Sequence, residues 1–350
     1  MTKKVLATPA EPTPEPTPEP TSTLRGFEPQ YKTISDYIVR ITHRIWEEAD
    51  VGYIYDTYSH QCTVHTPYGV AYGTEDVVSG TVAVLAGFPD RRLFPEDIVW
   101  RGDDEAGFYT SHLIFNTATN TGYSPYGPPT GKRVQFYGVA ECFVRENRIR
   151  EEWLVRDTAA LVRQLGLDPW EVARRAVRRG ERSSVSVYGE TDRLRGQLPP
   201  ASYQATEGED GLETFVRQLF HDVWNGRHFN RVRETHRADV SMFVPNHLQV
   251  KGANNVRTYI MSLIAMFPDA HMNVEDVYRL GDEAAGYRVS VRWRFSGTHG
   301  TYGPYGPPTG KRVNVLGLSH LHVQGGQVHK HYFVFDELAV MMQLVDAEIA

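Results

Sequence analysis

A ten-residue segment occurs twice in this 350-residue chain, and this repeat limits the possible folds more than any other feature. Residues 125–134 (PYGPPTGKRV) recur letter for letter at 304–313, 179 residues further on. The same offset relates Phe88–Asp90 to Phe267–Asp269. A period this long corresponds to a whole domain, because solenoid repeats span only about 20–50 residues. The sequence therefore predicts two copies of one domain.

Composition and local sequence divide the chain into four segments. Residues 1–27 form a Pro/Thr/Glu-rich tail, in which closely spaced prolines block helix and strand formation, so we expect it to be disordered. The first copy (domain 1) spans 28–166, a polar linker spans 167–208, and the second copy (domain 2) spans 209–350. A hydrophobic content of 41% is ample for two packed cores.

Charge and missing patterns exclude several classes of protein. A net charge of −6 gives no basic surface for nucleic acid, and no apolar run reaches the roughly 18–20 residues that cross a membrane. The apolar run at 5–7 is too short for a signal peptide. Cys62 and Cys142 fall in expected strands and are interpreted as buried thiols, which fits a cytoplasmic location.

Neither a cofactor nor a metal ion is expected. Residues 127–132 are one residue short of a phosphate-binding loop, and their prolines remove N–H donors. Domain 2 has histidines whose spacing makes a metal site geometrically possible: His320 with His322, His329 with His331, and His299 in a loop. No carboxylate or cysteine completes this set, and the flanking residues indicate surface exposure. We therefore predict no metal.

The periodicity of apolar residues predicts an α+β fold in each copy. Apolar residues at helical spacing in 34–45 predict a first helix, and a second and a third are expected at 51–59 and from Thr74. Strands are expected at 62–66, 96–101, 107–116, 132–144 and 149–157, followed by a last helix from Thr158. This order favours three helices packed on the concave side of a curved antiparallel sheet.

Strand alternation in domain 2 indicates which side chains point inward. In the strand 287–295, apolar side chains alternate with arginines and a serine. The same parity in domain 1 places His112 and Asn116 on the inward face, with His112 where domain 2 has Val291. A histidine at such a position is either hydrogen-bonded in the core or lines a cavity.

The last strand of each copy ends in an aspartate. Trp153, Val155 and Asp157 share one face, which we take as the inward one, and Asp336 is the counterpart of Asp157. In an apolar pocket such a carboxyl has a raised pKa, suited to acid–base catalysis. The alternative is that both aspartates cap the helix that follows.

Tyrosines and histidines concentrate near the second helix and first strand of domain 1. The set comprises Tyr53, Tyr55, Tyr58, His60, His65, Tyr68 and Tyr72. Phenols and imidazoles offer hydrogen bonds, proton transfer and stacking to a phenolic or polyketide-like ligand. Alternatively, they are half-buried tyrosines at a domain interface.

Three motifs together resemble those of SnoaL-like polyketide cyclases, over nearly all of both copies. They are Phe-Pro-Asp before a strand, Pro-Thr-Gly-Lys before a glycine-bearing strand, and Trp-x-x-x-Asp closing the last strand. The resemblance implies an NTF2-like α+β cone with a deep apolar cavity and cofactor-free acid–base chemistry at carbon. It also implies an Asp–His pair matching Asp157 and His65, and sheet-to-sheet pairing, so that the two copies form a pseudo-dimer within one chain. Further homo-oligomerisation stays open.

These observations lead to one leading hypothesis and two alternatives. We expect domain 1 to be a cofactor-independent lyase, isomerase or aldol-type cyclase acting on a hydroxylated aromatic or polyketide-like small molecule, with domain 2 as a diverged partner. Asp157 would be the general acid–base, His65 and His112 would relay protons, and Tyr58 would bind an oxyanion. The expected substrate contacts are Tyr55, Tyr68, Trp46, Trp153 and Asn116. The alternatives are a non-catalytic carrier of hydrophobic ligands and a structural interaction module.

Overall fold

The computed structural model describes residues 24–183 and 202–345. Most of the expected tail and the linker segment 184–201 lie outside the described residues. Domain 1 contains α1 (Ile34–Trp46), η1 (Val51–Tyr53), α2 (Ile54–Thr57), β1 (Tyr58–Thr66), β2 (Gly69–Tyr72), α3 (Gly73–Gly87), β3 (Arg92–Asp103), β4 (Gly107–Thr119), β5 (Arg133–Arg145), β6 (Arg148–Arg156) and α4 (Thr158–Gln164), and is followed by α5 (Pro169–Arg178).

Domain 2 repeats this element order. It contains α6 (Gly211–Phe220), η3 (His221–Asn225), α7 (Arg231–Thr235), β7 (His236–Val244), β8 (Leu248–Lys251), α8 (Ala253–Met266), β9 (His271–Asp282), β10 (Gly286–Thr298), β11 (Arg312–Gln324), β12 (Gln327–Phe335) and α9 (Glu337–Leu344). The duplication read from the sequence is therefore a duplication of structure.

Each domain has a six-stranded mixed sheet. The strand order is β2-β1-β6-β5-β4-β3 in domain 1, and domain 2 has the equivalent order β8-β7-β12-β11-β10-β9. The expected all-antiparallel sheet is wrong in one respect, since β1 pairs with β6 in parallel, as β7 does with β12. A long connection through β2, α3, β3, β4 and β5 separates β1 from β6, and parallel pairing requires such a crossover. The short strand β2 was not predicted.

The first helix illustrates how the sequence sets local structure. Thr33 caps α1 by accepting a hydrogen bond from the Asp36 N–H, and the expected apolar face of the helix is buried. The second helix ends at Thr57, two residues earlier than expected, because β1 begins at Tyr58. Cys62 and Cys142 are buried free thiols, as predicted. Among the described residues, no helix is both long and apolar enough to span a membrane.

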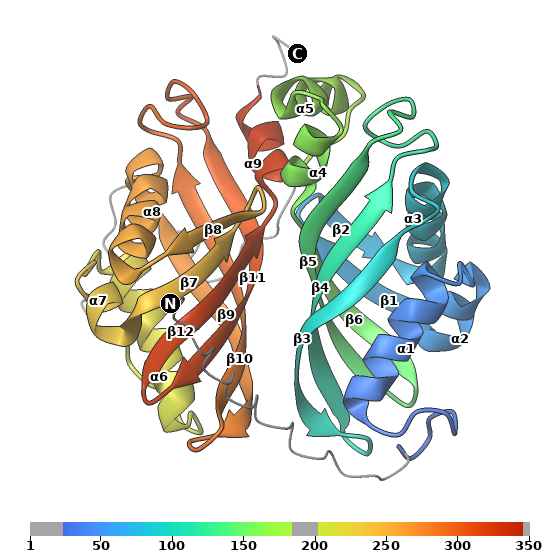
Figure 1. Ribbon diagram of the computed structural model, residues 1–350, viewed down its shortest axis with the longest axis horizontal. Coiled ribbons are helices and arrows are strands. Elements are labelled where there is room, and N and C mark those ends of the chain that lie inside the picture. Colours follow the sequence, from blue (N-terminus) through green and yellow to red (C-terminus); the bar gives the residue numbers. More distant parts are fainter. Residues whose placement is uncertain (1–23, 184–201, 346–350) are drawn as a thin grey trace, which may run out of the picture.

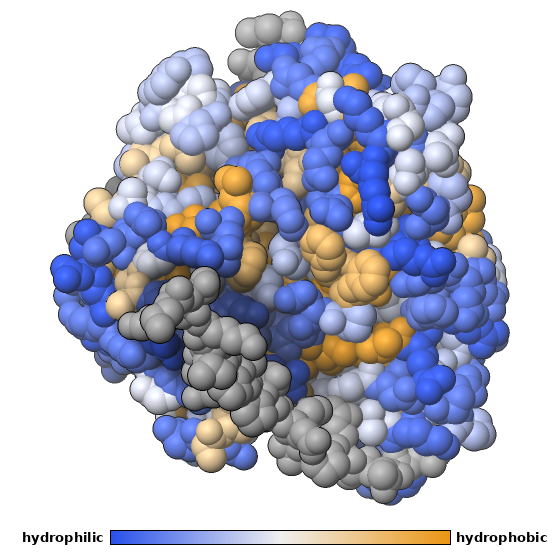
Figure 2. All heavy atoms as spheres, in the orientation of Figure 1, coloured by the Kyte–Doolittle hydropathy of each residue, from blue (hydrophilic) through white to orange (hydrophobic). Residues whose placement is uncertain are grey.

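The two sheets pack against each other, and the helices α1–α3 and α6–α8 cover their outer faces (Figure 1). One apolar cluster joins both sheets: Leu113, Val139, Trp153 and Val155 from domain 1, and Leu316, Leu318, Tyr332 and Val334 from domain 2. Both faces of each sheet are therefore buried, one under its own helices and one against the other domain. Outside this contact, the face in Figure 2 is mostly hydrophilic, with apolar side chains in small groups.

The segment expected as a linker begins with a packed helix. Residues Val172, Ala173, Ala176 and Val177 of α5 are buried in the same apolar cluster as residues of α9. Figure 1 shows α4, α5 and α9 together at one end of the molecule. This end of the chain segment 167–208 thus contributes to the contact between the domains.

Candidate active site

Domain 1 contains a cavity of about 310 Å³ between its helices and the outer face of its sheet. Its walls come from α1, α2, α3 and all six strands of the sheet, and most of the lining is aliphatic. The polar or aromatic lining residues are Thr42, Trp46, Tyr58, Thr66, Asp76, Thr81, Arg91, Asn116, Glu152 and Arg156. A largely apolar cavity with a few polar groups on one wall is typical of a small-molecule site.

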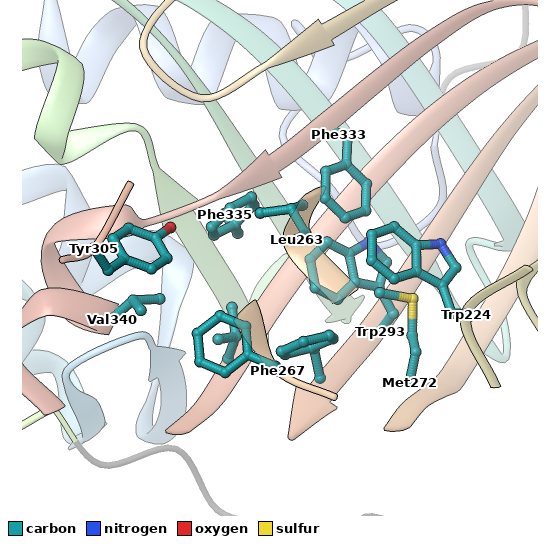
Figure 3. A pocket seen from close by; sticks show the side chains of 11 residues that line it. Trp224, Leu263, Phe267, Met272, Trp293, Tyr305, Phe333, Phe335 and Val340 are labelled. Carbon is teal, nitrogen blue, oxygen red and sulfur yellow. The ribbon is translucent and has the colours of Figure 1, made fainter. Parts of the chain in front are cut away.

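The matching space in domain 2 is almost filled by aromatic side chains. Its volume is only about 30 Å³, and Figure 3 shows Trp293, Phe333 and Trp224 crowded together inside it. Trp293 lies against Gly317, where a Cβ atom would come within 2.1 Å of the indole ring. Domain 1 has Ile114 in place of Trp293, so its cavity stays open.

A buried carboxyl and a phenol form a pair inside the domain 1 cavity. Tyr58 Oη donates a hydrogen bond to Glu152 Oε2 over 2.9 Å, and Glu152 is only 6% exposed. Burial raises the pKa of Glu152, and the Tyr58 hydrogen bond and the charge of Arg156 offset this only in part. A carboxyl with a raised pKa is a stronger base than an ordinary carboxylate once it is ionised.

Two guanidinium groups lie on the same wall. Arg91 Nη2 donates to Asn116 Oδ1 over 2.6 Å, and the Cζ atoms of Arg91 and Arg156 are 4.4 and 5.5 Å from the Trp46 ring centroid. Burial and the neighbouring charge of Arg156 hold the pKa of Arg91 well below its usual value. Within residues 24–183 and 202–345, neither arginine forms an ion pair with a carboxylate. Neither guanidinium is therefore neutralised by a direct ion pair.

A family comparison agrees with this architecture. The sequence model of the family described as "SnoaL-like polyketide cyclase" matches residues 37–165 and again 214–344. The chain belongs to the SnoaL-like polyketide cyclase family. Both domains have the NTF2-like α+β fold that the sequence motifs implied. No curated protein sequence matches this SnoaL-like chain.

Solved structures similar to this SnoaL-like chain each match one part of it. A protein proposed to be a SnoaL-like polyketide cyclase, from Jannaschia sp. CCS1, shares 25% identity over 40% of this chain and 97% of its own, with a TM-score of 0.35. AclR of Streptomyces galilaeus, a proposed hydroxylase, shares 23% identity over 38% of this chain and 83% of its own, with a TM-score of 0.34. IdmH of Streptomyces antibioticus, a proposed polyketide cyclase, shares 22% identity over 38% of this chain and 98% of its own, with a TM-score of 0.33.

Three of the predicted site residues line the cavity of this SnoaL-like domain. Tyr58, Trp46 and Asn116 are all part of its wall. Tyr68 lies in a second, adjoining chamber. Tyr55 is 38% exposed and donates to Glu75 Oε2 over 3.0 Å, so its phenol does not reach the cavity.

Two others, Trp153 and His65, lie on the opposite face of the sheet. Trp153 belongs to the interdomain cluster, and the His65 ring stacks on it with a centroid distance of 5.2 Å. His65 Nε2 is 2.8 Å from Glu151 Oε1. The expected inward orientation of Trp153 is wrong because both faces of β6 are buried, and alternation alone cannot tell the two faces apart.

Asp157 likewise lies between the domains rather than in the cavity. Its carboxylate accepts the Ala160 N–H at the start of α4 and the Asn246 N–H from domain 2, at 3.2 and 2.6 Å. Burial raises the pKa of Asp157 to about 7. The helix-capping alternative therefore describes its contacts, and the expected placement in the pocket is wrong.

The sequence interpretation missed Glu152, Arg156 and Arg91. The first two alternate with Leu154 along β6 and point into the cavity. A signal existed in the repeat: domain 2 has His331 and Phe335 at the positions of Glu152 and Arg156, and Ala270 at that of Arg91. Charge present in one copy and absent from the other marks the site better than the strand-end aspartates that both copies keep.

Of the five histidines considered for a metal site, His299, His320 and His331 are buried and His322 and His329 are half-buried, so the expected surface exposure is wrong. His320 is fully buried, and its Nδ1 is 2.9 Å from Asp97 Oδ2 of domain 1, which is also 3.1 Å from His322 Nε2. A carboxylate does therefore approach this pair. No group of three or more His, Cys, Asp or Glu side chains that could hold a metal ion occurs in the described parts of the chain.

His112 is buried on the inward face of β4 but does not line the cavity. It is 1% exposed, and neither ring nitrogen has a hydrogen-bond partner among the described residues. Burial, with a smaller contribution from the charge of His320, lowers the pKa of His112 to about 3. The folded protein thus holds this ring neutral.

Replacing His112 by valine is expected to reduce the acid sensitivity of folding. An unfolded histidine binds a proton below about pH 6.5, whereas folded His112 does so only near pH 3. The wild type therefore loses stability from this group as the pH falls through that window, and His112→Val does not. The free energy of unfolding of His112→Val, relative to that of the wild type, should rise by about 1.4 kcal/mol for each unit by which the pH falls within this window. Urea unfolding at several pH values measures this, and a constant difference would contradict it.

Proposed function

We propose that domain 1 is a cofactor-independent acid–base enzyme that acts at carbon on a hydroxylated aromatic or polyketide-like molecule. The observation that supports this most directly is the Glu152–Tyr58 pair, buried in a cavity of about 310 Å³. The family membership agrees with chemistry of the cyclase type. The role first expected for Asp157 passes to Glu152, because Glu152 lines the cavity and Asp157 does not.

In this proposal Glu152 is the general base. Its carboxylate removes a proton from a carbon next to a carbonyl group, and the electron pair of the C–H bond moves onto the carbonyl oxygen. Arg156 lies on the same face of β6 and stabilises the negative charge on that oxygen. The enolate then attacks an internal carbonyl in an aldol closure, or is reprotonated at another carbon in an isomerisation. The reverse aldol cleaves a carbon–carbon bond.

Domain 2 is proposed to have a supporting role. Its inner space is nearly filled, and it has no carboxyl or guanidinium at the positions of Glu152 and Arg156. A single active cavity per chain follows from this difference.

The repeat provides a variant that closes the domain 1 cavity. Ile114→Trp with Ala140→Ser copies domain 2, where Trp293 lies over a glycine and its Nε1 donates to Ser319 Oγ over 3.0 Å. Domain 1 has the matching glycine, Gly138. Because domain 2 accommodates this arrangement, the double variant should fold and lose turnover.

The test incubates a panel of polyphenolic and polycyclic compounds with each protein, without added cofactor, and follows products by mass and absorbance. Loss of water indicates condensation, and unchanged mass with altered absorbance indicates isomerisation. The wild type should convert at least one compound that the filled variant leaves unchanged. Stoichiometric binding with every compound recovered intact would support the carrier alternative, and equal turnover by both proteins would refute a site in this cavity.

A further inference from the structure

A second chamber of about 140 Å³ adjoins the domain 1 cavity. The two spaces share lining residues: Thr66, Val84, Arg91, Leu154 and Arg156. Tyr68 and Tyr126 bring phenol groups to the second chamber, and Asp336 reaches it from domain 2. The site is therefore longer than the first cavity alone, and domain 2 supplies part of its outer end.

Arg91 lies where the two chambers meet. It is only 5% exposed, and its Nε and Nη2 atoms both donate to the neutral Asn116 Oδ1, at 3.2 and 2.6 Å. The other terminal nitrogen, Nη1, has no hydrogen bond to any described residue. A buried guanidinium without a carboxylate partner is costly unless an anion satisfies it.

The repeat indicates that this charge serves a ligand rather than the fold. Domain 2 has Ala270 at the position of Arg91 and Phe295 at that of Asn116, and there the space between sheet and helices is filled by apolar side chains. The fold therefore does not need an arginine at this position. The arginine occurs only in domain 1, the copy that has an open cavity.

The outer end of the second chamber suits a hydroxyl group. Tyr68 Oη donates to Asp336 Oδ2 over 2.6 Å, and the same carboxylate accepts the Leu338 N–H at the start of α9. Burial raises the pKa of Asp336 to about 6, in spite of these hydrogen bonds. A ligand hydroxyl near this pair can both donate and accept hydrogen bonds.

We infer that the substrate is an elongated carboxylate. Its carboxylate binds Arg91 at the junction, its reacting part lies beside Glu152, and its other end extends towards Tyr68 and Asp336. This inference rests on the proposed function for the identity of the reacting end, but the carboxylate contact is a property of binding alone. Arg91 is thus a specificity-determining residue, separate from the base.

The experiment compares a planar acid with its neutral ester. Binding of anthraquinone-2-carboxylate and of its methyl ester is measured by calorimetry with the wild type, Arg91→Met, Arg91→Lys and Arg92→Met. The variant Arg92→Met is the matched control, because it removes the same charge from the adjacent position. There the arginine side chain is exposed and pairs with Glu47 over 2.8 Å. Circular dichroism checks that each variant is folded.

We expect the wild type and Arg92→Met to bind the acid about 10- to 100-fold more tightly than the ester, as for a charge-assisted hydrogen bond in a buried site. Arg91→Met should bind the two equally, and Arg91→Lys should keep part of the preference. Equal binding by the wild type, no binding of the acid, or a preference that survives Arg91→Met would each overturn the inference. The Glu152→Gln protein should keep the preference for the acid over the ester. Binding of the carboxylate is thereby tested independently of the proposed catalysis.

Discussion

Replacing Glu152 by glutamine is expected to lower turnover by about 10²–10⁴-fold, the usual contribution of a general base. Glutamine keeps the size of the side chain and can still accept the Tyr58 hydrogen bond, so the cavity should keep its shape. Ligand binding should therefore change little while kcat falls. The measurement is the rate of product formation on any compound that the wild type converts.

Glu151→Gln is the matched control for this variant. Glu151 is the preceding residue of β6, but it points to the other face of the sheet and contacts His65. Its replacement should leave turnover within about twofold of the wild type, as is usual for substitutions outside a site. Equal losses in the two variants would contradict the assignment of the base.

The pH profile gives a second test of the same assignment. Burial raises the pKa of Glu152, and only its ionised form can accept a proton. Wild-type kcat/KM should therefore increase with pH as Glu152 ionises, and this increase should be centred above the ordinary pKa range of a carboxyl. The residual activity of Glu152→Gln should lack this limb.

Replacing Arg292 by methionine is expected to destabilise the protein by about 3–5 kcal/mol, because it leaves a buried carboxyl without its partner. Arg292 Nη1 donates to Glu141 across the interface, and its Nε donates to Glu275 Oε2 over 3.1 Å. Its Cζ atom also lies 3.7 Å from the ring centroid of Trp153. Glu141 is fully buried, so water cannot replace the lost contact.

Urea-induced unfolding measures this loss. The double variant Arg292→Met/Glu141→Leu serves as the control, since removing both partners of a buried pair is often close to neutral. It should recover most of the stability that the single variant loses. A single variant within about 1 kcal/mol of the wild type would show that the pair contributes no more than a surface ion pair does.

The sequence predicted the fold well because the repeat supplied an internal comparison. The helical spacing in α1 and the alternation in β10 each have one clear apolar face, and both were interpreted correctly. The parallel pairing of β1 with β6 was missed, because strand direction is set by the path of the chain and not by local pattern.

The site was predicted less well, for a physical reason. In β6 both alternating sets are buried, one against the helices and one against domain 2. The more apolar set, with Trp153 and Val155, faces the other domain. The usual assumption that the more apolar set faces the helices of its own domain therefore selected the wrong face. Asn116 was placed correctly because its counterpart strand in domain 2 alternates apolar side chains with arginines and a serine, and this parity carries over to β4.

The interface also has a consequence for how the two cavities could diverge. In a symmetric dimer of identical subunits, a substitution such as Ile to Trp at position 114 would close both cavities at once, and a residue like Asp336 would have to serve every site equally. Joining the two copies in one chain removes that constraint. One half can exchange its cavity for a solid aromatic core, and it can still supply Asp336 to the outer chamber of its neighbour. The two domains thus correspond to the unlike subunits of a heterodimer, held in one molecule by the chain that joins them.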